Sequence, residues 1–179
     1  MGDVNRFAAR GAAQMRAENL SGVWTVVGRR ERLETDAPPP PYTTADLLVD
    51  AAGRLHWSAE RTMRVAQSLF EGGYITYPRT DSPRVAPQVV ERARRAVAAL
   101  YGQDALPQPG ETVPRLSPGE SGFVQDAHEA VRPTDPDRQP GDVPPGEERL
   151  LYRLIWSRFL AAFMRPARVR VVTLTLEKT

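Results

Sequence analysis

The chain has 179 residues, 41% of them hydrophobic and 26% charged, with a net charge of +2, which is typical of a globular protein and excludes disorder throughout. It has no cysteine, no apolar run near the roughly 18 residues of a membrane span, and no visible signal peptide. The sequence therefore predicts a cytoplasmic protein without disulfides and without a membrane partner. Among its 24 basic residues only Lys178 is a lysine, which favours phosphate contacts or reflects codon bias in a GC-rich genome.

The first 41 residues are expected to form a helix and a strand. Asp3 caps the helix predicted over Asp3–Leu20, and Val23–Leu33 alternates as a strand does. The prolines at Pro38–Pro41 cannot join a helix, so they are predicted to be a stiff, extended connector and the first domain boundary.

Two short helices and a β-prone segment follow the connector. Thr43 or Thr44 is expected to cap the first helix, and Ser58 the second. Helix, turn, helix and then a β element is the order of a winged-helix unit, which often lays a helix against DNA. The alternative is that the two helices only pack on each other, with Arg61 and Arg64 merely exposed.

Two further helices and a strand are predicted beyond this unit. Pro87 opens a helix that stops at Gly102, and a long surface loop over Gln103–Gln125 leads towards a helix at Glu147–Met164. The apolar face of this last helix, expected to centre the core, consists of Leu150, Leu151, Leu154, Ile155, Phe159 and Ala162. Val169–Leu176 alternates as a strand, and we expect it to pair with the first strand outside a mainly helical body.

The segment Gly72–Pro83, GGYITYPRTDSP, is the best candidate for a reactive centre. An extended path would place Tyr77 and Arg79 on one side, with Asp81 beyond them. A phenol titrates near 10 and needs a neighbouring cation to attack at neutral pH, and an arginine is permanently charged and grips phosphate. The alternative is that the tyrosine is a packing residue and that the polar residues form a turn.

A second polar block lies at Asp126–Asp135, DAHEAVRPTD. A histidine such as His128 titrates near neutrality, so it could donate a proton to a phosphate oxygen, or it could be an ordinary surface residue. Asp135 and Asp137 have the spacing of a paired-carboxylate metal site. They lie in a proline-rich loop instead of at the end of a strand, so no metal site is predicted there.

The motif ITYPRTDS at Ile75–Ser82 resembles the active-site signature of type IA DNA topoisomerases. The blocks PPPYTTADLLVDA and TMRVAQSLFEGG precede it, and DAHEAVRPTD and LLYRLIWSRFLAAFM follow it, all in the order of that family. Within the family, the PPPYTT block and the short gap before the tyrosine motif look most like the topoisomerase half of a reverse gyrase. HEAVRP is also similar to bacterial topoisomerase I, and the proline after the tyrosine is similar to topoisomerase III.

The resemblance implies a strand-cleavage reaction and its residues. Tyr77 would attack a DNA phosphodiester and hold the broken 5′ end, with Arg79 and His128 as the other catalytic residues. The DNA-binding residues implied by the same motifs are Thr80, Asp81, Ser82, Glu129 and Arg132.

The resemblance also implies an α+β, mainly α fold. Residues 42–165 would form a winged-helix-like catalytic tyrosine domain, flanked by parts of an arch domain at 1–41 and 166–179. The family's acidic domain, which binds Mg²⁺, matches no segment of this chain. We therefore expect Mg²⁺ to bind outside this chain, and we expect no metal to be bound by the chain itself.

The expected partners are single-stranded DNA and the missing acidic and arch domains of the same polypeptide. Without those domains the chain is expected to be inactive. Two alternatives stay open at this point: a non-catalytic winged-helix-like DNA-binding module, and a tyrosine-based strand-transfer enzyme of another kind.

Overall fold

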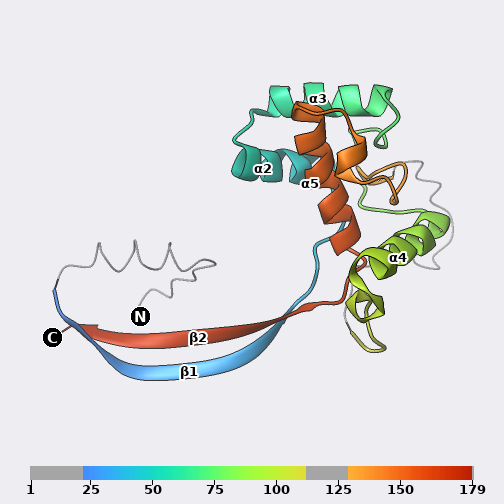
Figure 1. The fold of residues 1–179 in the computed structure, drawn as a ribbon. Helices are drawn as coiled ribbons and strands as arrows, with labels where there is room; N and C mark the ends of the chain where they lie inside the picture. Colours follow the sequence, from blue (N-terminus) through green and yellow to red (C-terminus); the bar gives the residue numbers. More distant parts are fainter. Residues whose placement is uncertain (1–21, 112–128, 179) are drawn as a thin grey trace. The chain divides into compact units, whose positions relative to one another are not determined.

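A computed structural model describes residues 22–111 and 129–178 (Figure 1). The helix predicted over Asp3–Leu20 and the second half of the predicted long loop lie outside the described residues. The chain divides into two compact units, residues 1–34 with 169–179 and residues 35–168. None of the described helices has both the length and the apolar character needed to cross a membrane.

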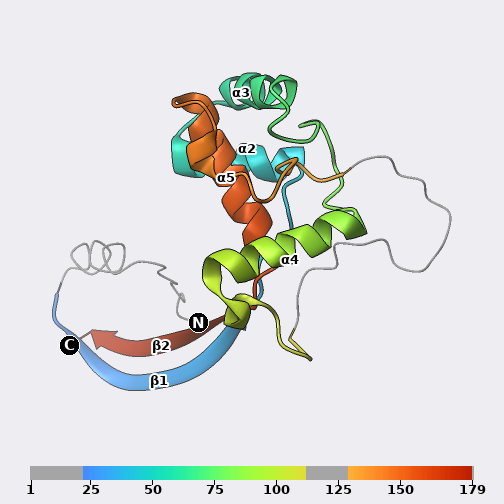
Figure 2. The same cartoon turned by 45° about the vertical axis from the view of Figure 1, so that its right-hand side comes forward.

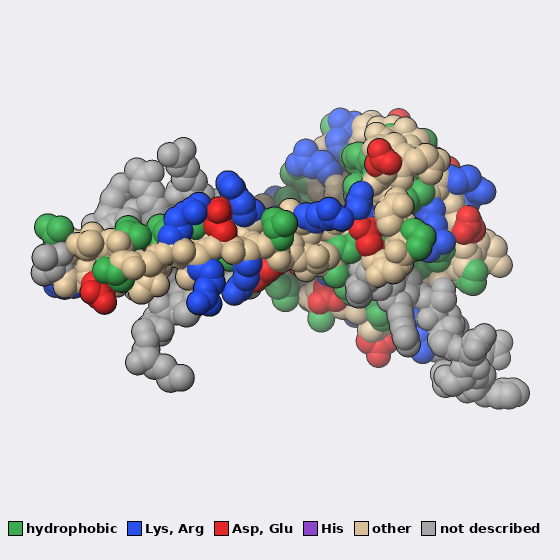
Figure 3. Space-filling view, turned by 90° about the horizontal axis from the view of Figure 1, so that it is seen from below, with side chains coloured by type: hydrophobic (Ala, Val, Ile, Leu, Met, Phe, Trp, Pro, Cys, Tyr) green, Lys and Arg blue, Asp and Glu red, His purple; other side chains and the backbone are tan. Residues whose placement is uncertain are grey.

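The smaller unit is built on a two-stranded ribbon. Strand β1 (Trp24–Asp36) pairs with β2 (Ala167–Lys178), and the two run in opposite directions (Figure 1). This pairing confirms the prediction that the first and last strands come together. Nearly every side chain of the ribbon is exposed, because a pair of strands has no second layer of its own to cover it. Lys and Arg side chains project from it between hydrophobic ones (Figure 3).

The larger unit contains four α-helices among the described residues. These are α2 (Thr44–Leu55), α3 (Ala59–Glu71), α4 (Pro87–Tyr101) and α5 (Glu147–Ala161), with short 3₁₀ turns at Gln103–Ala105 and Pro140–Asp142. The fold is thus α+β and mainly α, as predicted. Helix α5 packs against α2, α3 and α4 and is the central element of this unit (Figures 1 and 2).

The buried face of α5 is different from the predicted apolar stripe. Leu151, Ile155 and Phe159 are completely buried, as expected, but Leu150 is 39% exposed. The residues of α5 that are buried in addition are Tyr152, Trp156 and Leu160. The predicted stripe differs from the buried face because the helix contacts three other helices, and its buried residues come in adjacent pairs that form a wider face.

The helix ends follow local signals in the sequence. Thr43 is the N-cap of α2 and accepts a hydrogen bond from the Asp46 amide at 3.2 Å, while Ser58 does the same for α3. Pro87 opens α4, and Gly102 ends it with a φ of 88° that favours glycine. The predicted starts of these three helices are confirmed.

Apart from the strand ends at 35–36 and 167–168, no regular strand forms in the described part of the larger unit. The β-prone segment after α3 makes one isolated antiparallel bridge, between Ile75 and Pro133, and a second bridge joins Tyr42 to Val131. Proline has no N–H to donate, so pairing cannot continue past Pro133 or past Pro78 in the opposing segment.

The proline connector belongs to the larger unit, beyond the division at residues 34–35. The Arg158 side chain of α5 donates a hydrogen bond from Nε to the Pro40 carbonyl at 2.6 Å. Tyr42 directly after the connector is 1% exposed, and its hydroxyl donates to Asp50 at 2.6 Å. These contacts hold the end of the connector on the helical body.

Adjacent leucines of α5 test this packing. Leu151→Ala should lower the free energy of unfolding by about 2–5 kcal/mol, the usual cost of emptying a buried leucine site. Leu150→Ala, one residue away, should cost less than about 1 kcal/mol because that side chain is already partly solvated. Urea denaturation of both variants measures the difference, and equal losses would contradict the burial of Leu151.

Candidate active site

The chain turns sharply between α3 and Tyr77. Gly73 adopts a φ of +69°, and the Tyr74 amide donates back to the Leu69 carbonyl at 2.9 Å. A Cβ on Gly72 would lie 2.8 Å from the Tyr74 ring, so the side chain of any other residue would displace that ring. The glycine pair therefore ends the helix and directs the chain into the tyrosine motif.

Side-chain exposure alternates through the motif. Tyr77, Arg79 and Asp81 are exposed, whereas Pro78 is buried, Thr80 is half-buried, and Ser82 after Asp81 is buried. This is the pattern expected for an extended segment with one outward side. The sequence prediction that Tyr77 and Arg79 share a side agrees with it.

Tyr77 differs from most of the chain's tyrosines in its surroundings. Burial raises the pKa of Tyr42, and the hydrogen bond to Asp50 adds to the shift; burial also raises the pKa of Tyr152. Both of those hydroxyls are therefore held neutral inside the fold. Tyr77 is 50% exposed, and Tyr101, 52% exposed, lies at the end of α4 away from any motif.

The Tyr77 ring lies against one other aromatic ring. Phe70, in the last turn of α3, meets it edge to face, with 5.3 Å between ring centroids and 70° between ring planes. Phe70 itself is 38% exposed. This contact restrains the ring, while half of the Tyr77 surface stays exposed.

Arg79 is exposed, and within the described residues its side chain has no ion pair or hydrogen bond. Its guanidinium is thus available to an external anion. Thr80 and Ser82, the neighbouring polar residues, are used internally: Thr80 Oγ1 accepts from the Ser82 amide at 3.1 Å, and Ser82 Oγ accepts from the Arg84 amide at 3.3 Å. Their hydroxyls shape the turn that follows Arg79.

Thr76 and Thr44 connect the tyrosine segment to two other parts of the chain. Thr76 Oγ1 lies 2.6 Å from the Ala130 carbonyl and accepts from the Arg132 amide at 3.0 Å. Thr44 Oγ1, in the first turn of α2, lies 2.7 Å from the Pro78 carbonyl and accepts from the Thr80 amide at 2.8 Å.

Glu129 and Arg132 are predicted from the sequence to bind DNA, and the structure places them mostly inside the fold. Arg132 is 7% exposed and donates to Glu129 Oε2 and to the Pro133 carbonyl. Glu129 Oε1 accepts from the amide of Ala86, the N-cap of α4, at 3.1 Å. These contacts tie the HEAVRP block to the start of α4. His128 lies outside the described residues.

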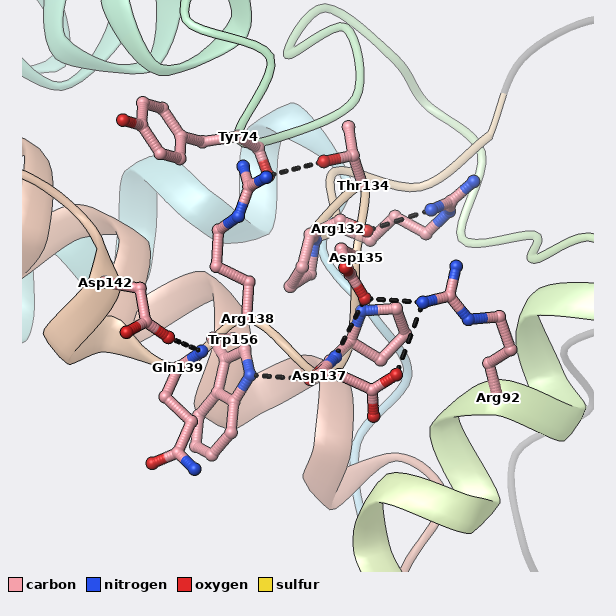
Figure 4. Close-up of polar contacts among 12 residues, drawn as sticks. Tyr74, Arg92, Arg132, Thr134, Asp135, Asp137, Arg138, Gln139, Asp142 and Trp156 are labelled. Atoms are coloured by element: carbon pink, nitrogen blue, oxygen red, sulfur yellow. Dashed lines mark hydrogen bonds and ion pairs between the residues drawn. The ribbon is translucent and has the colours of Figure 1, made fainter.

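Asp135 and Asp137, the residues with paired-carboxylate spacing, both face an arginine. Arg92 of α4 contacts Asp135 at 2.6 Å and Asp137 at 3.3 Å (Figure 4). The two carboxylates therefore share one guanidinium, and Arg92 is used within the fold. Among the described residues there is no group of three or more histidine or acidic side chains that could hold a metal ion.

Three residues of the site are not indicated as such by the sequence. Thr44 is recognisable there only as a helix cap, Thr76 only as part of a β-prone run, and Phe70 only as a helix residue. Their contacts with Pro78, Ala130 and the Tyr77 ring join separate segments of the chain, so spacing alone does not reveal them.

Comparisons with known proteins agree with the motif order. A family model described as DNA topoisomerase matches residues 2–179. DNA topoisomerase 1 of Synechococcus elongatus is 42% identical over 157 residues, and that of Mycobacterium tuberculosis strain H37Rv is 36% identical over 183 residues. The alignments cover 86% and 98% of this chain but only 17% and 19% of those proteins.

A solved structure gives the same result for the fold. Full-length topoisomerase I from Thermotoga maritima superposes with a TM-score of 0.67 and 28% identity, over 98% of this chain and 29% of that one. The chain belongs to the type IA DNA topoisomerase family. These relatives do not distinguish the reverse gyrase subfamily, which stays a prediction.

The internal position of Arg132 leads to a stability prediction. Arg132→Ala should lower the free energy of unfolding by about 2 kcal/mol, because a hydrogen bond to a charged group typically contributes about 1.5–3 kcal/mol. Arg94→Ala, which removes an exposed pair with Glu91, is the control and should cost less than about 1 kcal/mol. If chemical denaturation gives equal losses of unfolding free energy for the two variants, the internal role of Arg132 is wrong.

Proposed function

We propose that this chain is the tyrosine-bearing part of an enzyme that cleaves and rejoins one DNA strand and thereby changes supercoiling. Membership of the type IA family supports this, since the motif ITYPRTDS resembles the family's active-site signature. The observation that carries the proposal is the geometry of that motif. Tyr77 and Arg79 are exposed on a backbone held by hydrogen bonds on both sides, and Arg79 has no ion-pair partner among the described residues.

The proposed reaction exchanges one phosphodiester bond for another. Tyr77 Oη attacks the phosphorus and loses its proton, a new P–O bond forms, and the bond from phosphorus to the 3′ oxygen breaks. The 3′ oxygen leaves with a proton, and the 5′ phosphate stays on the tyrosine. Rejoining is the reverse attack by the 3′ hydroxyl, so no net oxidation or hydrolysis occurs.

Arg79 and His128 have complementary proposed roles. Negative charge develops on the non-bridging oxygens in the transition state, and a guanidinium can stabilise it with two parallel hydrogen bonds. A histidine near its pKa can supply the proton that the departing 3′ oxygen takes up. The role of Arg79 is supported by its exposure, and the role of His128 rests on its place in the HEAVRP block.

DNA contact is proposed for the exposed part of the motif. Asp81 is exposed and Thr80 partly exposed, so both can reach a bound strand. Ser82, Glu129 and Arg132 engage in contacts inside the fold, and we propose that they orient the two motif blocks more than they touch DNA.

The described residues do not offer a Mg²⁺ site. The pair with the right spacing, Asp135 and Asp137, is bound to Arg92, and no larger acidic group is present among the described residues. We propose that Mg²⁺, which the family commonly uses, is held by an acidic domain outside this chain, and no step of the proposed reaction depends on it.

The proposed partners follow from the extent of the match. The chain spans about a fifth or less of the curated relatives named above, so the acidic domain and the rest of the arch would come from other parts of the same polypeptide. We propose that residues 1–41 and 166–179 belong to the arch and residues 42–165 to the tyrosine domain, with the connector at Pro38–Pro41 packed on the tyrosine domain. The proposed substrate is a single-stranded DNA segment, in the cytoplasm.

A covalent adduct tests the chemistry. The chain alone should form no DNA-linked product, whereas a protein joining it to the remaining domains of a type IA topoisomerase, called here the completed protein, should form one with labelled single-stranded oligonucleotide. Tyr77→Phe should abolish the adduct on a denaturing gel, because only the attacking hydroxyl is removed. Tyr101→Phe, at an equally exposed tyrosine, is the control and should leave it unchanged.

Two results would contradict the proposed chemistry. An adduct that persists in Tyr77→Phe would remove Tyr77 from the nucleophile role. Failure of the folded completed protein to form any adduct would favour the non-catalytic DNA-binding module.

Arg79 should dominate the phosphate contacts of the chain. Arg79→Ala should weaken binding of the chain to single-stranded DNA and reduce the slope of log affinity against log salt by about 1, the value for one lost phosphate contact. Arg95→Ala, at an exposed arginine of α4, is the control. Fluorescence anisotropy at several salt concentrations measures the affinity of both variants. Equal losses of affinity would mean that Arg79 contributes no more than Arg95 to contacts with the DNA backbone.

A further inference from the structure

Two threonines, Thr76 and Thr44, make the same set of hydrogen bonds to two different segments. The Thr76 amide donates to the Arg132 carbonyl at 2.9 Å, and its hydroxyl accepts from the Arg132 amide at 3.0 Å while lying 2.6 Å from the Ala130 carbonyl. The main-chain and side-chain groups of one threonine thus bind three groups within a three-residue stretch of HEAVRP.

Thr44 repeats the arrangement on the other side of the nucleophile. Its amide donates to the Thr80 carbonyl at 2.9 Å, and its hydroxyl accepts from the Thr80 amide at 2.8 Å while lying 2.7 Å from the Pro78 carbonyl. Each hydroxyl has one proton, so it donates to one carbonyl at a time and accepts an amide proton as well. A valine has the same shape but can do neither.

These hydrogen bonds are made by the residues directly before and after Tyr77. Thr76 precedes it and is bound to the HEAVRP block, whereas Pro78 follows it and is bound to α2 through Thr44. The hydroxyls act where a sheet ladder is unavailable, because Pro78 and Pro133 have no N–H to donate. The backbone through Tyr77 and Arg79 is consequently fixed at both ends by side chains.

We propose that Thr44 and Thr76 are positioning residues for strand cleavage, which hold the Tyr77 hydroxyl and the Arg79 guanidinium in register with the scissile phosphate. This inference rests on the proposed function of Tyr77. Neither threonine needs to touch DNA. Their effect is on alignment, and a misplacement of about 1 Å in a reacting group can cost on the order of 100-fold in rate.

A purely structural role would give different results from a positioning role. Thr62 of α3 provides the comparison, because it is completely buried and its hydroxyl donates to the Ser58 carbonyl at 2.9 Å within the same helix. Thr62→Val removes a similar bond without touching the tyrosine segment. Thr→Ser at positions 44 and 76 keeps the hydroxyl and removes only a methyl group.

The experiment measures adduct formation by the completed protein at saturating single-stranded oligonucleotide, with Thr44→Val, Thr76→Val, the two serine variants and Thr62→Val. The valine variants should form adduct about 10- to 100-fold more slowly. Their affinity for DNA should stay within about twofold, since no DNA contact is lost. The serine variants should recover most of the rate, and Thr62→Val should react at the normal rate.

The inference is overturned if both valine variants react at the normal rate, or if the serine variants are as slow as the valine variants. It fails separately from the proposed function, because Tyr77→Phe is measured in parallel. Loss of the adduct in Tyr77→Phe together with normal rates in the valine variants would contradict the inference and leave the proposed function intact. An adduct retained in Tyr77→Phe would contradict both the proposed function and the inference that rests on it.

Amide exchange in the unmodified chain covers the case in which a valine variant does not fold. The amides of Thr80 and Arg132 should exchange at least tenfold more slowly than that of Arg79, which has no hydrogen bond among the described residues. Exchange of Thr80 and Arg132 as fast as that of Arg79 would overturn the inference without any substitution.

Discussion

The site depends most on how the backbone through Tyr77 is held in place without a sheet. Pro78 follows the tyrosine and Pro133 lies opposite Ile75, so main-chain pairing stops after single bridges. Side-chain hydroxyls from Thr44 and Thr76 take over the hydrogen bonding. Because those hydroxyls belong to different segments, they join the tyrosine motif, the start of α2 and the HEAVRP block by hydrogen bonds.

A second network fixes the same segments from the side of α5. The Arg158 guanidinium lies over the Tyr42 ring at 4.8 Å and donates to the Pro40 carbonyl. The Tyr42 carbonyl in turn accepts from the Val131 amide at 2.8 Å. The PPPY and HEAVRP blocks therefore meet beside the central helix, so motifs that are widely separated in the sequence lie close together in the fold.

Local features of the fold were predictable, and features that depend on distant partners were not. Thr43, Ser58 and Gly102 mark helix ends because capping needs only a few neighbouring residues. The stripe on α5 wrongly included Leu150, since one-sided burial was assumed for a helix that packs on several sides.

The same distinction holds within the candidate site. The outward direction of Tyr77 and Arg79 follows from two-residue periodicity, which a sequence displays directly. The internal positions of Glu129 and Arg132, and the ion pair of Arg92 with Asp135, depend on contacts across more than 40 residues or on burial. The family resemblance implied DNA contacts for Glu129 and Arg132, because the internal partners of these two residues are not visible in the sequence.

The central claim is that Tyr77 forms the bond to DNA through the 5′ phosphate. Its most direct test is mass spectrometric mapping of the peptide that carries a labelled nucleotide after the completed protein is trapped on single-stranded DNA and digested. The account predicts one modified peptide, with the 5′ phosphate on Tyr77. A nucleotide on Tyr74 or Tyr101, or attachment through a 3′ phosphate, would contradict it.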